Sequence, residues 1–89
     1  MPPYYRIELH QSAEKVLRRL PRDLKERITI AIFALETNPK PPGAIPLKGH
    51  SDTWRIRVGE WRIIYAIEDD RMIVSIIKIG PRGDVYRNL

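Results

Sequence analysis

The chain has 89 residues, no cysteine and a net charge of +5, from 16 lysines and arginines against 11 aspartates and glutamates. The lack of cysteine excludes disulfides, thiolate metal ligands and thiol nucleophiles, and it fits a reducing compartment. No stretch reads as a signal peptide or approaches the ~18 apolar residues of a membrane span, so we expect a single cytoplasmic domain over residues 1–89 with no membrane contact. The positive charge favours polyanionic partners such as nucleic acid.

The first third of the chain predicts a strand followed by two helices. Residues 4–9 alternate apolar and polar side chains, with aromatic and branched residues among them, which is typical of a strand. Ser12 offers an N-cap for a short amphipathic helix that ends at Pro21. A longer amphipathic helix follows and stops before Pro39. Because only residues 20–23 separate the two helices, we expect an antiparallel helical hairpin.

A proline-rich segment, NPKPPGAIPLKGH, covers residues 38–50 and holds four prolines and two glycines. Prolines cannot donate to a sheet ladder, so this composition excludes a helix and a central strand. We interpret the segment as a stiff connector that delivers Leu47, Lys48 and Gly49 to the next strand.

From Trp54 the apolar period changes to two, as expected of a hairpin. Counting outward from the Gly59–Glu60 turn gives these cross-strand pairs: Val58 with Trp61, Arg57 with Arg62, Ile56 with Ile63, and Arg55 with Ile64. One face of the hairpin is then apolar, and the other carries an arginine face made of Arg55, Arg57 and Arg62. Like charges that face each other across strands cost roughly a few tenths to 1 kcal/mol. A small domain that keeps this repulsion is predicted to hold a polyanion there.

The almost continuous apolar run at residues 72–79 predicts a central strand that is buried on both faces, and residues 80–84 break it. The predicted fold class is therefore α+β. An N-terminal strand and a helical hairpin precede a three-stranded antiparallel meander, and together they form one mostly antiparallel sheet with the helices on one face.

The arginine face is the best candidate for chemistry, because guanidinium groups bind phosphate oxygens bidentately and stay charged. The two histidines, His10 and His50, have no cysteine or carboxylate at ligand spacing, so we expect no metal site. A structural alternative is that the arginines extend into solvent or pair with carboxylates such as Glu60 and Glu68.

The C-terminal half, LKGHSDTWRIRVGEWRIIYAIEDDRMIVSIIKIGPRGDVYR, resembles the RelE/ParE superfamily of bacterial and archaeal toxins. The shared pattern is L-x-G, an aromatic-R/K-I-R/K strand, a G-x-Y/W-R strand, an apolar strand and G-x-R-x-x-x-Y. The preceding strand and helices fit the family's order, so the resemblance covers nearly the whole chain. RelE-like members are mRNA interferases that cut messenger RNA in the ribosomal A site, whereas ParE-like members poison DNA gyrase.

Carried over position by position, the resemblance favours the RelE branch and implies a catalytic set of basic residues and a tyrosine: Arg55, Arg57, Arg62, Arg82 and Tyr86. It also implies RNA contacts by Lys48, Arg55 and Arg57. Relatives often have lysines where this chain has Arg55 and Arg57, and a guanidinium is a very poor base near neutrality. Three side chains stay open as the general base: Lys48, Glu60 and Tyr86.

The resemblance further implies a metal-independent, cofactor-free reaction in which the ribose 2′-hydroxyl attacks the adjacent phosphate. Its implied partners are the ribosome with its messenger RNA and a RelB-like antitoxin in a toxin–antitoxin hetero-oligomer. Two other functions stay open. One is a ParE-like inhibitor of DNA gyrase, and the other is a non-catalytic module that binds nucleic acid or an antitoxin.

Overall fold

Two helices and five strands make up residues 4–81, the part of the chain that the computed structural model describes. The predictions made for Arg82 and Tyr86 lie outside these residues. In chain order the elements are β1 (Arg6–Leu9), α1 (Gln11–Arg19), α2 (Arg22–Ala34), β2 (Ile45–Pro46), β3 (Thr53–Val58), β4 (Trp61–Glu68) and β5 (Ile73–Pro81).

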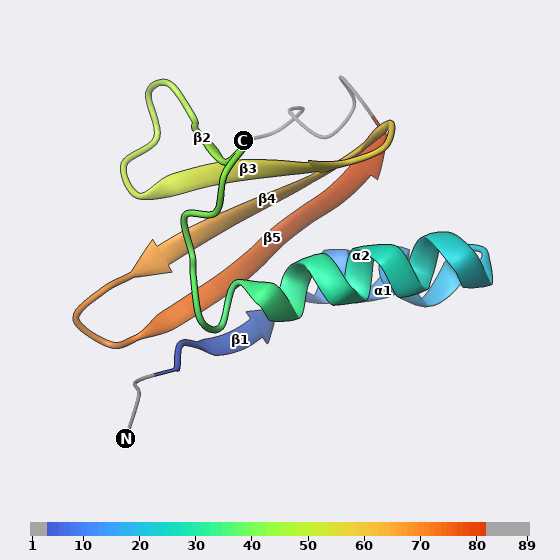
Figure 1. The fold of residues 1–89 in the computed structure, drawn as a ribbon, viewed down its shortest axis with the longest axis horizontal. Coiled ribbons are helices and arrows are strands. Elements are labelled where there is room, and N and C mark those ends of the chain that lie inside the picture. The colour runs from blue at the N-terminus through green and yellow to red at the C-terminus, as the bar shows by residue number, and fades with distance from the viewer. Residues whose placement is uncertain (1–3, 82–89) are drawn as a thin grey trace.

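The strands form one sheet in the order β1-β5-β4-β3-β2, and both helices cover the same face of it (Figure 1). β1 runs parallel to β5, while every other neighbouring pair is antiparallel. A parallel pair needs a long crossover connection, and the α1–α2 hairpin begins that crossover. The predicted α+β fold, with a mostly antiparallel sheet and helices on one face, is confirmed.

The proline-rich connector contains a short strand, β2, that the sequence did not predict. Ile45 pairs with Arg55 and Pro46 pairs with Trp54 at the outer edge of the sheet. Proline is tolerated on an edge strand because one side of that strand needs no ladder donors. The prolines therefore exclude a central strand, as predicted, but they leave room for an edge strand.

The prediction that Ser12 caps the first helix is wrong. The helix begins two residues earlier than that cap would place it, at Gln11, with His10 in the cap position and no side-chain cap hydrogen bond. The backbone N–H of His10 donates to the carbonyl of Ile76 at 2.9 Å, so the β1–β5 ladder continues to the helix start. The Ser12 hydroxyl instead makes a long contact of 3.4 Å with the carbonyl oxygen of Ile77. Packing against β5, rather than a local cap, sets where this helix begins.

The hydrophobic core lies between the helices and the sheet. Its fully buried or nearly buried side chains come from both helices, from the residue that caps α2 and from the three long strands: Ala13, Ile28, Ile32, Leu35, Ile56, Ile63, Tyr65, Ile67, Val74, Ile76 and Ile79. The alternation of these residues along β3 and β4 turns their neighbours to the uncovered face of the sheet. Within residues 4–81 no helix is long and apolar enough to cross a lipid bilayer.

Tyr65 connects the core to the connector, since its hydroxyl donates a hydrogen bond of 2.7 Å to the carbonyl oxygen of Pro39. Burial raises the pKa of Tyr65 from its usual 10 to about 12. The folded state therefore holds this proton to higher pH than the unfolded state does. The stability that follows is fully present below pH 10 and is lost as the pH rises towards 12.

We expect Tyr65→Phe to lower the free energy of unfolding by about 0.5–1.5 kcal/mol at pH 8, because it removes one buried hydrogen bond. This deficit should shrink as the pH rises above 10, since phenylalanine has no proton to lose. Urea unfolding of both proteins, followed by tryptophan fluorescence at pH 8, 10 and 11, measures the difference. A deficit that stays constant over this range would contradict the assignment.

Candidate active site

The β3–β4 turn fixes the register of the hairpin. Gly59 takes a φ of 61°, whereas Glu60 does not have a positive φ. A positive φ at the first central position alone is the pattern of a type II′ turn, which suits a two-residue hairpin. A Cβ at Gly59 would stand 3.5 Å from Nη2 of Arg27, so the guanidinium of Arg27 from α2 lies against this turn. The four predicted cross-strand pairs are confirmed.

Figure 1 shows both helices on one face of the sheet. The arginines alternate with core residues along β3 and β4, so the arginine face lies on the other, uncovered surface. Arg57 is directly opposite Arg62, and Arg55 is a diagonal neighbour of Arg62. Arg57 is exposed, while Arg55 and Arg62 are partly buried. Nε of Arg62 is buried and makes no hydrogen bond within residues 4–81, although the side chain is otherwise engaged. The hairpin thus holds three guanidinium groups of like charge within one small area.

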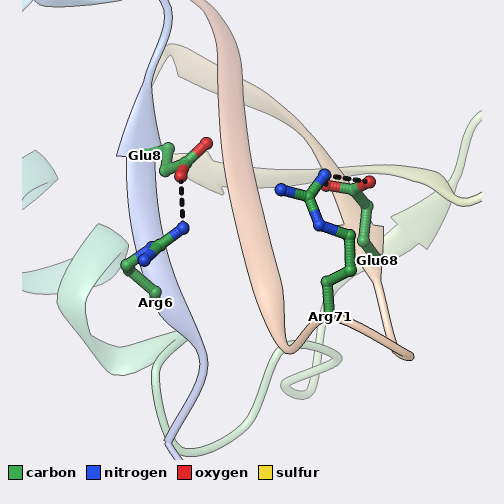
Figure 2. A network of polar contacts seen from close by, with 4 residues as sticks. All are labelled: Arg6, Glu8, Glu68 and Arg71. Carbon is green, nitrogen blue, oxygen red and sulfur yellow. Dashed lines mark hydrogen bonds and ion pairs between the residues drawn. The ribbon is translucent and has the colours of Figure 1, made fainter.

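Glu68 does not neutralise the arginine face. Its carboxylate pairs with Arg71 at 3.2 Å, and Glu8 pairs with Arg6 at 3.0 Å (Figure 2). Glu68 lies six residues along β4 from Arg62, which is about 20 Å in an extended strand. The proposed pairing of the arginines with Glu68 is therefore wrong. The carboxylates of Glu8 and Glu68 are neutralised at the end of the strands far from the β3–β4 turn.

The two described candidates for a general base lie at opposite ends of β3. Glu60 is in the β3–β4 turn, two residues before Arg62, and it is exposed. Lys48 is exposed in the connection between β2 and β3. The six residues of β3 span about 20 Å between these ends, so the structure does not bring Lys48 and Glu60 together. Within residues 4–81 no group of three or more His, Cys, Asp or Glu could hold a metal ion.

A β-bulge in β5 adds a cation that the sequence reasoning missed. Ile79 pairs with Ile63 and Lys78 pairs with Ile64, but the next residue of β4, Tyr65, pairs with Ile76, so Ile77 is the extra residue. A bulge shifts the register by one residue and turns the side chains beyond it to the other face. Without the bulge, Lys78 would pair with a core residue. With it, Lys78 lies on the same face as the arginines.

Lys78 was missed because residues 72–79 were predicted to be buried on both faces. β5 is an interior strand with a neighbour on each side, but it is not the central strand of the five, and Ser75 and Lys78 on the uncovered face are only partly buried. The signal in the sequence was a single lysine inside an apolar run. The orientation of Lys78 depends on the bulge, and no residue in this apolar run indicates that a bulge is present.

The comparisons with known proteins agree with the fold. Residues 7–86 match the family model of the "ParE toxin of type II toxin-antitoxin system, parDE". The chain belongs to the RelE/ParE toxin superfamily. It is 32% identical over 87 residues to a candidate toxin, RelE1, of Methanocaldococcus jannaschii, which covers 94% of this chain and 97% of that protein.

Two solved structures extend the likeness of this toxin to three dimensions. The crystal structure of the RelE–RelB complex from Pyrococcus horikoshii superposes with a TM-score of 0.80 at 32% identity, over 90% of this chain and 97% of that chain. The isolated RelE toxin of E. coli gives a TM-score of 0.79 at 21% identity, over 89% of this chain and 85% of that chain. The first similarity supports the family, and the second supports the fold. This chain is thus a RelE-like toxin of a type II toxin–antitoxin system.

Proposed function

We propose that this toxin is a ribosome-dependent endoribonuclease that cleaves messenger RNA in the A site and so inhibits translation. The observation that carries the proposal is the arginine face, where Arg57 stands directly opposite Arg62 and Arg55 lies diagonally beside them. A rigid hairpin holds these guanidinium groups together despite their repulsion. A phosphodiester would convert that repulsion into attraction, since each phosphate oxygen accepts hydrogen bonds from guanidinium groups.

In the proposed reaction the 2′-oxygen of a ribose forms a bond to the adjacent phosphorus, and the bond from phosphorus to the 5′-oxygen breaks. The products are a 2′,3′-cyclic phosphate and a 5′-hydroxyl. A base takes the 2′-hydroxyl proton, and the leaving 5′-oxygen gains a proton. Negative charge increases on the nonbridging oxygens in the transition state. Arg62, which is partly buried near the turn of the hairpin, would stabilise this charge with help from Arg55.

The proton transfers need a group other than the arginines, because a guanidinium with a pKa above ~12 is a very poor base near neutrality. Of the two described candidates, we favour Glu60 over Lys48. Glu60 is two residues from Arg62 at the same end of the hairpin, whereas Lys48 is at the opposite end of β3. Tyr86 stays a third candidate. We assign Arg82 an electrostatic role at the leaving 5′-oxygen, by the resemblance alone.

We also propose a RelB-like antitoxin as partner, in a toxin–antitoxin hetero-oligomer in the cytoplasm. The homologous proteins of P. horikoshii and M. jannaschii crystallised as complexes of RelE with RelB. In this chain α2 exposes two large apolar side chains about one turn apart, with Ile30 64% and Phe33 53% exposed. Neighbouring exposed apolar side chains of this kind are typical of protein contacts.

Inducing the toxin without an antitoxin tests the proposal. We expect growth arrest and new 5′ ends on translated messages, located within codons that occupy the A site, and we expect co-expression of the cognate antitoxin to relieve both. Intact transcripts with normal translation would contradict the proposal. Because the matching family model is named for ParE, DNA gyrase, which the resemblance gives as the target of ParE-like toxins, stays the second candidate target. The same culture tests it through loss of plasmid supercoiling. Growth without either effect would favour a non-catalytic binding module.

A further inference from the structure

We propose that Lys78 of β5 binds the phosphate backbone of the RNA together with the arginine face, and so extends the binding site from the β3–β4 hairpin onto the next strand of the sheet. This inference rests on the proposed function. Lys78 is not one of the residues that define the sequence motif shared with the RelE/ParE superfamily.

The register of the sheet places Lys78 among the arginines. Arg55 and Lys78 are the two cross-strand neighbours of Ile64, one from β3 and one from β5. Arg62 pairs with Gly80, so Lys78 is its diagonal neighbour on the same face. Diagonal neighbours lie ~7–8 Å apart, which long side chains can bridge. A phosphate above Ile64 is therefore within reach of Arg55, Arg62 and Lys78 from three adjacent strands.

The surroundings of Ile64 favour binding of an anion at this point. Ile64 is fully buried although it lies on the face that the helices leave uncovered, and its neighbours Arg55 and Lys78 are only partly exposed. Lysine and arginine can cover apolar surface with their aliphatic stems while the charged ends stay accessible. The centre of the site thus has an apolar floor with cations around it, and electrostatic attraction is stronger next to a floor of low polarity than in bulk water.

The bulge is the reason that Lys78 has this orientation. An uninterrupted register would direct Lys78 towards the core, where an unpaired ammonium is costly. The extra residue, Ile77, reverses the direction of Lys78. Ile79, the residue after Lys78, then lies in the core. Bulges often occur beside functional sites, where they redirect a side chain. Gly80, which pairs with Arg62, adds no side chain between the lysine and the arginine pair.

Binding of a single-stranded RNA whose 2′-hydroxyls are all methylated tests the proposal, because this probe cannot be cleaved by 2′-oxygen attack. We expect Lys78→Met, which keeps an aliphatic stem without the charge, to weaken binding about 10- to 100-fold at low salt. The slope of log K against log salt should decrease in magnitude by about 0.7, as for one lost contact to a single-strand phosphate. Lys78→Arg should keep the slope of the unchanged protein.

Lys15→Met, on an exposed position of α1, is the matched control and should bind as the unchanged protein does. Circular dichroism of each variant verifies folding. If Lys78→Met gives the affinity and slope of the control, the role of Lys78 is overturned, even where the unchanged toxin cleaves messages. If binding depends on Lys78 but translated messages stay intact, the lysine contact stands and the proposed endoribonuclease function fails.

Discussion

Replacing Arg62 with alanine should lower the rate of messenger RNA cleavage about 10²–10³-fold, as expected when one fixed donor to a developing negative charge is removed. The free energy of unfolding should stay equal or rise slightly, because the change also removes the repulsion from Arg57 across the strands. Cleavage of translated messages on purified ribosomes, together with urea unfolding, measures the two effects separately.

Arg71→Ala provides a matched control for that variant. Arg71 is exposed in the β4–β5 turn and pairs with Glu68, at the end of the hairpin far from the arginine face. An exposed pair of this kind contributes about 0–1 kcal/mol, so neither stability nor cleavage should change much. If Arg62→Ala instead destabilises the protein strongly, the arginine is structural and the loss of cleavage would say nothing about phosphate binding.

Ile28→Ala should lower the free energy of unfolding by about 2–5 kcal/mol, because it removes buried methyl and methylene groups from the centre of the core. Ile28 is fully buried on the face of α2 that packs against the sheet. A domain of this size has little stability in reserve, so the variant should be partly unfolded at 37 °C. Thermal unfolding followed by circular dichroism measures the loss.

The same helix offers the control for this substitution. Ile30 is 64% exposed only two residues away, and Ile30→Ala makes the same chemical change with the same gain in helix propensity. Its effect on stability should stay within about 0.5 kcal/mol. A similar loss in both variants would show that the substitution acts on the helix itself rather than on the core.

The β3–β4 hairpin could be predicted in full from the sequence because its information is local. A two-residue turn with glycine at its first position sets the register, and the alternation of apolar residues then decides which face each side chain takes. The opposition of Arg57 and Arg62 follows from these two facts alone. For the same reason the three arginines were predicted with their correct partners across β3 and β4.

Other features depend on contacts between distant residues, and these could not be read locally. Ser12 has the chemistry of an N-cap, but the β1–β5 ladder continues to His10 and sets the start of the helix. The orientation of Lys78 depends on one extra residue in β5, and an apolar run shows no sign of such an insertion. Ile45 and Pro46 form a strand only because the edge of β3 is available to them.

The parallel pairing of β1 with β5 has a consequence for the order of folding. Strands β3, β4 and β5 follow one another through short turns, so their pairing closes only small loops. Arg6 and Ile73, by contrast, are partners across most of the chain, and contacts of such long range form slowly. We therefore expect the meander that carries the arginines to assemble early and β1 to dock afterwards. β1, the first strand in chain order, is thus expected to be among the last to join the sheet.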